Sequence, residues 1–213
     1  MICIFEFIGI KISLSSENPK IINYCINYFR NYFNYSFEEC DDISISVEIV
    51  EHFIVDYSYI LENEMPFKIF VHRNNPKIII TDVIDDDCRE IMRLIRELFI
   101  LLIATKKNNC FFHAACVAND EYAVAIIGDK FAGKTTMCIN FLNCGWDFVS
   151  NDKLLLIKEK DIFCWGLPVS LGIREGTKQL FLKEFSELKV DPDDNRYYLT
   201  PNELIKKFNV SVT

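Results

Sequence analysis

Two glycines, a lysine and a threonine form the most informative spacing in this chain. Gly128, Gly133, Lys134 and Thr135 fit the pattern G-x-x-x-x-G-K-[ST] within the stretch IIGDKFAGKTTM. Glycines let a loop curl so that successive backbone N–H groups point at one anion, and they let a phosphate approach the backbone closely. A helix that begins directly after such a loop turns the positive end of its dipole toward the same anion. The spacing therefore predicts a phosphate-binding loop.

The residue types in this loop indicate the ligand. We expect the Lys134 side chain to reach the β- and γ-phosphates of a nucleotide, and the Thr135 hydroxyl to bind Mg²⁺. Other contacts should come from the rest of the loop and the first turn of the helix: Gly128, Asp129, Lys130, Phe131, Ala132, Gly133 and Thr136. The predicted cofactors are ATP, or another nucleoside triphosphate, and Mg²⁺. The motif contains no base-reading residue, so ATP and GTP stay open.

The segments around the loop have the order that such a motif requires. Before it, the apolar run EYAVAIIG is typical of a strand buried on both faces. After it, KTTMCINFLNCG predicts a helix with Met137, Phe141 and Leu142 on its inner side and Gly145 just past its end. Upstream, CFFHAACVA predicts one strand. Downstream, WDFVSNDKLLLIKEK predicts a strand region that enters a hairpin near residues 160–161.

The first part of the chain reads as a separate α+β portion. Residues 2–14 predict a strand or hairpin, and residues 18–33 have helical spacing of apolar side chains. The stretches DISISVEIV, FKIFVHR and PKIIITDVI predict strands of an antiparallel sheet with one covered face. A helix over residues 87–105 follows, with Asp85, Asp86 and Asp87 at its start. We place the domain boundary there, giving residues 1–84 and 85–213.

Composition excludes several classes of protein. The 213 residues carry a net charge of -8, which argues against nucleic acid as a partner because no excess of basic side chains is present to neutralise phosphates. The nine cysteines include no CxxC pair, so we expect reduced, buried thiols and no zinc site. The N-terminus lacks the features of a signal peptide, and the longest apolar run is too short to cross a bilayer. We therefore expect a cytoplasmic protein with no membrane partner.

The stretch FHAACVANDEYAVAIIGDKFAGKTTMCINFLNCGWDFVSNDKLLL resembles the catalytic domain of HPr kinase/phosphorylase and of related peptide serine kinases, such as the lasso-peptide kinases. The shared order is a helix, a strand with His113, the glycine-containing loop, a helix ended by Gly145, and a strand delivering Asn151 and Asp152. Further on, GLPVSLGIREGT is similar to a family segment with a proline and an arginine, here Pro168 and Arg174.

This resemblance implies an α/β fold in which a P-loop-containing, HPr-kinase-like or phosphoenolpyruvate-carboxykinase-like mixed sheet is flanked by helices, preceded by the N-terminal α+β portion. It implies an ATP- and Mg-dependent kinase that phosphorylates a hydroxyl, typically of Ser, on a peptide, small protein or small molecule. The implied catalytic residues are Asp152, His113, Lys134 and Arg174, and the implied Mg²⁺ ligands are Thr135, Asp152 and Asn151. Asn151 stands where the family has Asp. Since relatives form hexamers, the resemblance also allows a homo-oligomer.

Other interpretations of the same residues stay open. The chain can be a non-catalytic nucleotide-binding module for regulation or assembly, which Asn151 favours, or an ordinary P-loop small-molecule kinase or NTPase. His113 can be a structural histidine bonded to backbone. Asp152 can cap a turn after its strand, and Arg174 can be a surface arginine.

Overall fold

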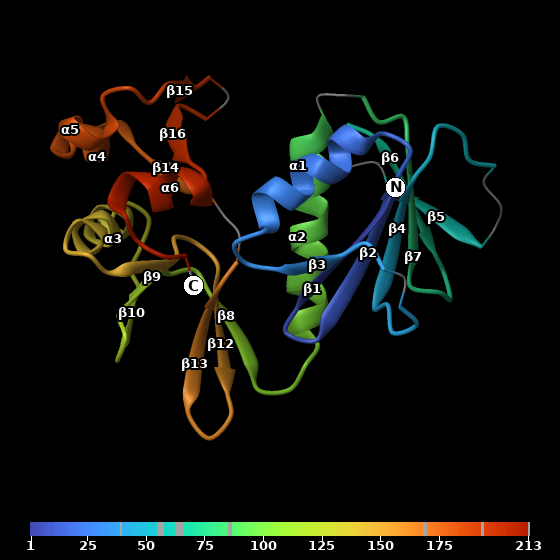
Figure 1. The fold of residues 1–213 in the computed structure, drawn as a ribbon, viewed down its shortest axis with the longest axis horizontal. Helices are drawn as coiled ribbons and strands as arrows, with labels where there is room; N and C mark the ends of the chain where they lie inside the picture. Colours follow the sequence, from blue (N-terminus) through green and yellow to red (C-terminus); the bar gives the residue numbers. More distant parts are fainter. Residues whose placement is uncertain are drawn as a thin grey trace. The chain divides into compact units, whose positions relative to one another are not determined.

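The structure is a computed structural model, and it describes residues 1–38, 40–54, 58–62, 66–84, 87–167, 170–192 and 194–212. The chain is of mixed α/β type and divides into two compact units, Met1–Thr105 and Lys106–Thr213. Each unit has its own strands and helices (Figure 1). We expected the boundary after residue 84. The division lies later because helix α2 (Cys88–Ala104) packs on elements of the N-terminal unit.

Within the described residues, the N-terminal unit contains one seven-stranded sheet of order β3-β1-β2-β4-β7-β6-β5. Its strands are β1 (Ile2–Phe7), β2 (Ile10–Ser16), β3 (Asn34–Ser36), β4 (Ile45–Ile49), β5 (Tyr59–Glu62), β6 (Lys68–His72) and β7 (Lys77–Thr81). The expectation of an antiparallel sheet is wrong at its centre, since β4 runs parallel to both β2 and β7. Helix α1 (Pro19–Phe29) lies between β2 and β4 in the chain and supplies the crossover that parallel neighbours need.

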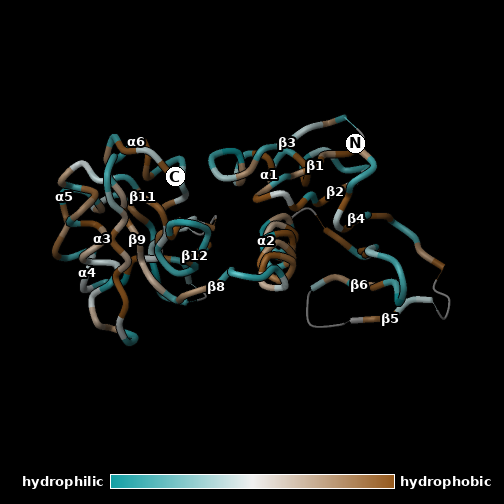
Figure 2. The backbone as a smooth tube through the Cα atoms, turned by 90° about the horizontal axis from the view of Figure 1, so that it is seen from below, coloured by the Kyte–Doolittle hydropathy of each residue, from teal (hydrophilic) through white to brown (hydrophobic). Residues whose placement is uncertain are grey.

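Helices α1 and α2 contact each other and both contact β2. Figure 2 shows α2 as largely hydrophobic (brown). Its buried side includes Phe99, whose ring centroid lies 4.4 Å from that of Phe33. Phe33 in turn stacks on Phe29 of α1, with centroids 4.8 Å apart. Aromatic burial of this kind fixes the two helices against the sheet.

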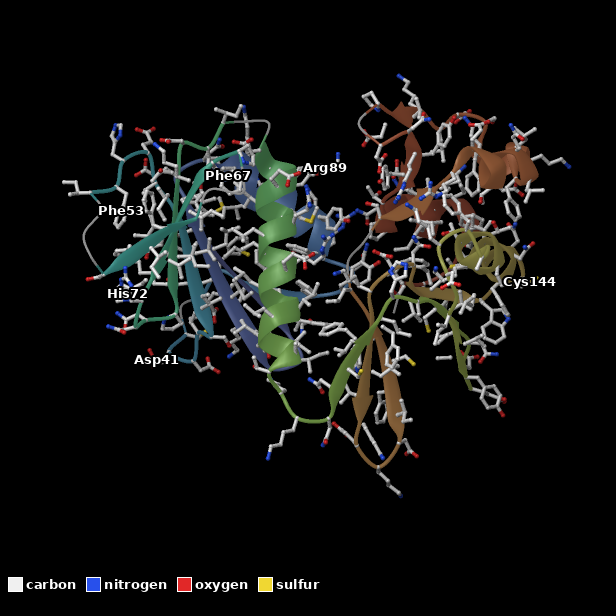
Figure 3. The ribbon with its side chains drawn as sticks, turned by 180° about the vertical axis from the view of Figure 1, so that it is seen from behind. Asp41, Phe53, Phe67, His72, Arg89 and Cys144 are labelled. Atoms are coloured by element: carbon white, nitrogen blue, oxygen red, sulfur yellow. The ribbon has the colours of Figure 1, made fainter. Side chains whose placement is uncertain are left out.

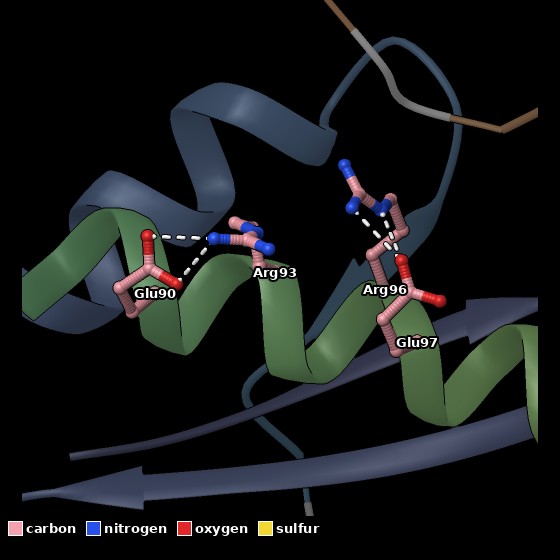
Figure 4. Close-up of polar contacts among 4 residues, drawn as sticks. All are labelled: Glu90, Arg93, Arg96 and Glu97. Carbon is pink, nitrogen blue, oxygen red and sulfur yellow. Dashed lines mark hydrogen bonds and ion pairs between the residues drawn. The ribbon is translucent and has the colours of Figure 1, made fainter. Parts of the chain in front are cut away.

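The outer side of α2 is charged, as its periodicity predicts. Glu90 pairs with Arg93 at 2.7 Å and Arg96 pairs with Glu97 at 2.9 Å (Figure 4). Of the three aspartates expected at the helix start, Asp85 and Asp86 lie outside the described residues. Asp87 holds the N-cap position, but its carboxylate accepts from the Ile84 N–H instead of from a helical N–H.

A tight turn joins β6 to β7. The His72 ring Nδ1 accepts hydrogen bonds from the backbone N–H groups of Asn74 and Asn75 in this turn, at 3.1 and 3.0 Å. Figure 3 labels His72 at the end of its strand. A side chain that satisfies two turn N–H groups stabilises the reversal.

The C-terminal unit contains three small sheets in its described part, of order β10-β9-β11, β13-β12-β8 and β14-β16-β15. The strands are β8 (Asn109–Phe112), β9 (Ala115–Ala118), β10 (Ala123–Ile126), β11 (Asp147–Ser150), β12 (Leu154–Lys158), β13 (Ile162–Gly166), β14 (Leu171–Ile173), β15 (Val190–Asp191) and β16 (Arg196–Leu199). The helices are α3 (Lys134–Asn143), α4 (Glu175–Leu180), α5 (Leu182–Phe185) and α6 (Pro201–Phe208). The expected hairpin is present between β12 and β13.

Helix α3 packs on the β10-β9-β11 sheet (Figure 1). Its buried residues are Cys138, Ile139 and Leu142. Met137, which we expected on the inner side, is 50% exposed, so that prediction is wrong. The prediction for the strand before the loop is also wrong: β10 alternates between exposed and half-buried positions, and β9 is the buried central strand.

The end of α3 is confirmed at Gly145, which has a φ of +84°. The Gly145 N–H donates to the Leu142 carbonyl and the Trp146 N–H donates to the Phe141 carbonyl, which together form a Schellman motif. The rings of Phe141 and Trp146 pack with centroids 5.0 Å apart and supply its hydrophobic contact. Cys144, labelled in Figure 3, is the C-cap residue.

Candidate active site

In the C-terminal unit, two neighbouring segments of the chain are each interrupted between two strands, and the two interruptions lie side by side. We expected CFFHAACVA to be one strand, but it forms β8 and β9, which belong to different sheets. In the partner strand, β11 and β12 are separated in the same way. Cys116 lies opposite Ser150 on one side of the break, and Phe112 lies opposite Leu154 on the other. Each strand advances by four residues between these pairs, so the register is unchanged across the break.

His113 and Asp152 both lie in this break. Continued pairing at the same register would set His113 opposite Lys153, so His113 and Asp152 are diagonal neighbours. The His113 Nδ1 atom lies 2.6 Å from the Asp152 Oδ1 atom. The side chains are 66% and 41% exposed, so both can be reached by a molecule from solvent. The structure gives His113 a carboxylate partner in place of the backbone partner that a purely structural histidine would have. Such a contact fixes the orientation of the ring and of the carboxylate relative to each other.

The glycine loop, which we define as residues 128–133, joins β10 to α3 and confirms the strand–loop–helix order. Gly133 has a φ of +85°, a conformation that suits glycine. Gly128 is favoured for a different reason, because a Cβ atom there would lie only 3.0 Å from the Ala132 Cβ. Phe131 also has a positive φ, of 74°, although it is not glycine.

The two residues after the loop make contacts that connect it to the strand break. The Lys134 Nζ folds back over the loop and donates to the carbonyls of Gly128 and Asp129 at 2.7 and 3.1 Å. The Thr135 hydroxyl donates to the Asn151 Oδ1 at 3.0 Å. Asn151 directly precedes Asp152 in the chain, so the start of α3 and the His113–Asp152 pair belong to one cluster.

Helix α4 brings a third element to the cluster. The Thr136 and Thr177 hydroxyls lie 3.0 Å apart, which ties α4 to α3. Arg174, the N-cap residue of α4, places its guanidinium carbon 4.6 Å from the centroid of the Phe131 ring. The structure thus brings Arg174 to the glycine loop. Pro168, the other residue of that predicted segment, lies outside the described residues.

Sequence reasoning did not find Thr177 or the contact between Phe131 and Arg174. The two threonines are far apart in the chain, and a pair of hydroxyls has no spacing signature. The arginine–aromatic contact depends on how α4 packs, which no local pattern specifies. Both contacts follow from tertiary structure alone.

The oxygen donors of the cluster suit a magnesium ion that arrives with a nucleotide. In the described part of the chain, no group of three or more His, Cys, Asp or Glu side chains could hold a metal ion. Mg²⁺ bound to a nucleotide takes most of its ligands from phosphates and water and needs only one or two from the protein. Thr135 and Asn151, whose side-chain oxygens are 3.0 Å apart, could supply that smaller number of ligands.

Two buried thiols belong to the elements that carry the site. Burial raises the pKa of Cys116 on β9 and of Cys138 on α3 to about 12. Thiols with such pKa values stay protonated at neutral pH and act as small apolar side chains. No disulfide joins the described cysteines. Across the ranges that the structure describes, no helix has the length and apolar character of a membrane span.

Comparison with known protein families gave no matching family, and comparison with curated proteins gave no matching relative.

Proposed function

We propose that this chain is an ATP- and Mg-dependent kinase that phosphorylates a hydroxyl, typically of a serine, on a peptide, a small protein or a small molecule. In this proposal, residues 106–213 form an HPr-kinase-like, P-loop-containing unit. The observation that carries the proposal is the continuity of the cluster. The glycine loop, Thr135, Asn151 and the His113–Asp152 pair follow one another through direct contacts or adjacent positions.

The glycine loop and Lys134 would bind the phosphates of the nucleotide. Backbone N–H groups of the loop and the N-terminus of α3 provide the anion-binding part. The Lys134 ammonium, already placed over the loop, provides a positive charge for the β- and γ-phosphates. Thr135, Asn151 and Asp152 would hold Mg²⁺, which neutralises charge on the phosphate oxygens when bound.

Asp152 would act as the base. The acceptor hydroxyl oxygen forms a bond to the γ-phosphorus, and the bond from that phosphorus to the β–γ bridging oxygen breaks, so that ADP leaves. The hydroxyl proton passes to the Asp152 carboxylate, whose orientation is set by the His113 Nδ1 at 2.6 Å. Because such reactions need mainly positioning and charge neutralisation, one well-placed carboxylate meets the requirement for a base.

Asn151 favours a second candidate, a nucleotide-binding module without catalysis. Its amide oxygen accepts from Thr135 in a neutral hydrogen bond, and it brings no negative charge to the site. A site with fewer charges can bind a nucleotide and its metal without completing phosphoryl transfer. The two candidates differ in whether the γ-phosphate is passed on.

The direct test is transfer of label from γ-³²P-ATP with Mg²⁺ to a panel of serine, threonine and tyrosine peptides and small alcohols. We expect transfer to a hydroxyl that falls by at least about 100-fold in Asp152→Asn, because a general base contributes that much or more. Lys160→Ala, a charge change in the β12–β13 turn of the same unit, is the matched control and should keep full transfer. Transfer that persists unchanged in Asp152→Asn contradicts the role of Asp152, and nucleotide binding with no transfer supports the second candidate.

A further inference from the structure

Phe131 combines two unfavourable properties in the middle of the glycine loop. Its φ of 74° lies in the left-handed region, which a bulky side chain rarely occupies. Its side chain is also 75% exposed, so its ring gains little from burial. A residue held in a sparsely populated conformation persists only when its surroundings fix it, and such residues cluster at functional sites. Burial in the core does not explain why an aromatic residue stands here.

The contact of the ring offers an explanation. The Arg174 guanidinium carbon lies 4.6 Å from the ring centroid, and the Lys130 Nζ lies 5.5 Å from it. Both are within the range of cation–π attraction. Among the described residues, no hydrogen bond or ion pair joins the Arg174 guanidinium to another protein group. Stacking on a ring leaves the guanidinium N–H groups at its edge available for an oxyanion.

The contact between helices α3 and α4 holds Arg174 near the loop independently of the ring. The hydrogen bond between Thr136 and Thr177 ties the first turn of α3 to α4, of which Arg174 is the N-cap residue. The arginine is half-buried, which reduces the range of positions open to it. The threonine pair thus fixes the position of α4 relative to α3, and the Phe131 ring fixes the position of the Arg174 guanidinium.

We propose that Phe131 is a positioning residue that holds Arg174 at the glycine loop to bind the terminal phosphate of a nucleoside triphosphate. This proposal rests on the proposed function, because it requires the loop to bind a nucleotide. In this proposal Arg174 binds the γ-phosphate, which ATP has and ADP lacks. The pair therefore makes the site selective for ATP over ADP.

The test is calorimetric titration of Mg-ATP and of Mg-ADP into the full chain. Arg174→Ala should weaken Mg-ATP binding by about 100-fold, as expected for loss of a charged hydrogen-bonding partner of phosphate, and should change Mg-ADP binding by less than about threefold. Phe131→Leu keeps an apolar side chain but removes the ring, and should weaken Mg-ATP binding by about tenfold. Phe131→Tyr keeps the ring and should therefore keep the wild-type preference for Mg-ATP over Mg-ADP.

The double variant Phe131→Leu/Arg174→Ala separates positioning from a general effect on the loop. If the ring acts through the arginine, the double variant binds Mg-ATP as weakly as Arg174→Ala and no more weakly. Equal losses for ATP and ADP in Phe131→Leu, or additive losses in the double variant, overturn the proposal while leaving nucleotide binding intact. A wild-type chain that binds neither nucleotide overturns the proposed function, and this inference with it.

Discussion

At the scale of single residues, Asn151 is where the site differs from one built on two carboxylates. Its amide oxygen accepts a hydrogen bond from the Thr135 hydroxyl, with the two oxygens 3.0 Å apart, and an aspartate could also fill this role. The difference is one negative charge beside the position assigned to Mg²⁺. Such a charge would attract the metal and would also repel the phosphates. Measuring ATP affinity at several Mg²⁺ concentrations separates these two effects.

We predict that Asn151→Asp lowers the Mg²⁺ concentration needed for half-maximal ATP binding by about tenfold, since an added carboxylate is a preferred ligand of this cation. Asn151→Ala removes the acceptor of the Thr135 hydroxyl and should raise that concentration. The measurement is ATP affinity at a series of Mg²⁺ concentrations, with Lys160→Ala as the control. An unchanged Mg²⁺ dependence in both Asn151 variants would show that this side chain does not take part in metal binding.

At the scale of elements, the strand–loop–helix unit shows what local sequence can and cannot specify. The loop, the helix after it and the end at Gly145 were predictable because each depends on residues close together in the chain. The exposure of β10 was not, because an apolar run does not reveal how many strands lie beside it. The contact between His113 and Asp152 was also invisible, because it depends on how two strands that are distant in the sequence lie side by side.

The two loop glycines should respond differently to substitution. Gly128→Ala places a Cβ 3.0 Å from the Ala132 Cβ, so the loop must shift and nucleotide affinity should fall by about tenfold or more. Adding Ala132→Gly removes the atom that clashes and should restore most of the affinity. Calorimetry with Mg-ATP provides the measurement.

Gly133→Ala is the comparison for the rescue of Gly128→Ala by Ala132→Gly. Nothing lies within 4 Å of a Cβ at this position, but its φ is +85°. The strain is therefore in the backbone, costs about 1–2 kcal/mol, and should not be relieved by Ala132→Gly. If Ala132→Gly rescued both glycine variants equally, or neither, the close contact would not be the cause of the first effect.

At the scale of the whole molecule, the chain has two compact units. The sequence predicts that there are two, but it does not predict the residue at which one ends and the other begins. The amphipathic pattern of α2 reveals an apolar side, but it does not say which sheet that side covers. We assigned the helix to the second domain, whereas Phe99 and its neighbours pack with Phe33 and α1. The parallel centre of the first sheet was missed for a similar reason, because strand direction is set by crossovers and not by strand composition.

The cysteines offer a test that covers both units. With a pKa of about 12, the thiols of Cys3, Cys116 and Cys138 should be thiolate in only about one molecule in 10⁴ at pH 8. Iodoacetamide should therefore modify the exposed Cys110 and Cys144 first, and the three buried thiols only after unfolding in guanidinium chloride. Peptide mass spectrometry over a time course would resolve the order. Modification of Cys116 as fast as Cys144 in the folded protein would contradict this packing.

The central claim is that the glycine loop binds a nucleotide through Lys134. Calorimetric titration of Mg-ATP into wild-type protein, Lys134→Ala and the control Lys160→Ala tests it most directly. We predict saturable binding to the wild type and the control, and a loss of affinity of at least about 100-fold in Lys134→Ala, because the variant loses a charged partner of the phosphates. Absence of binding to the wild type, or equal binding to Lys134→Ala, would contradict the account.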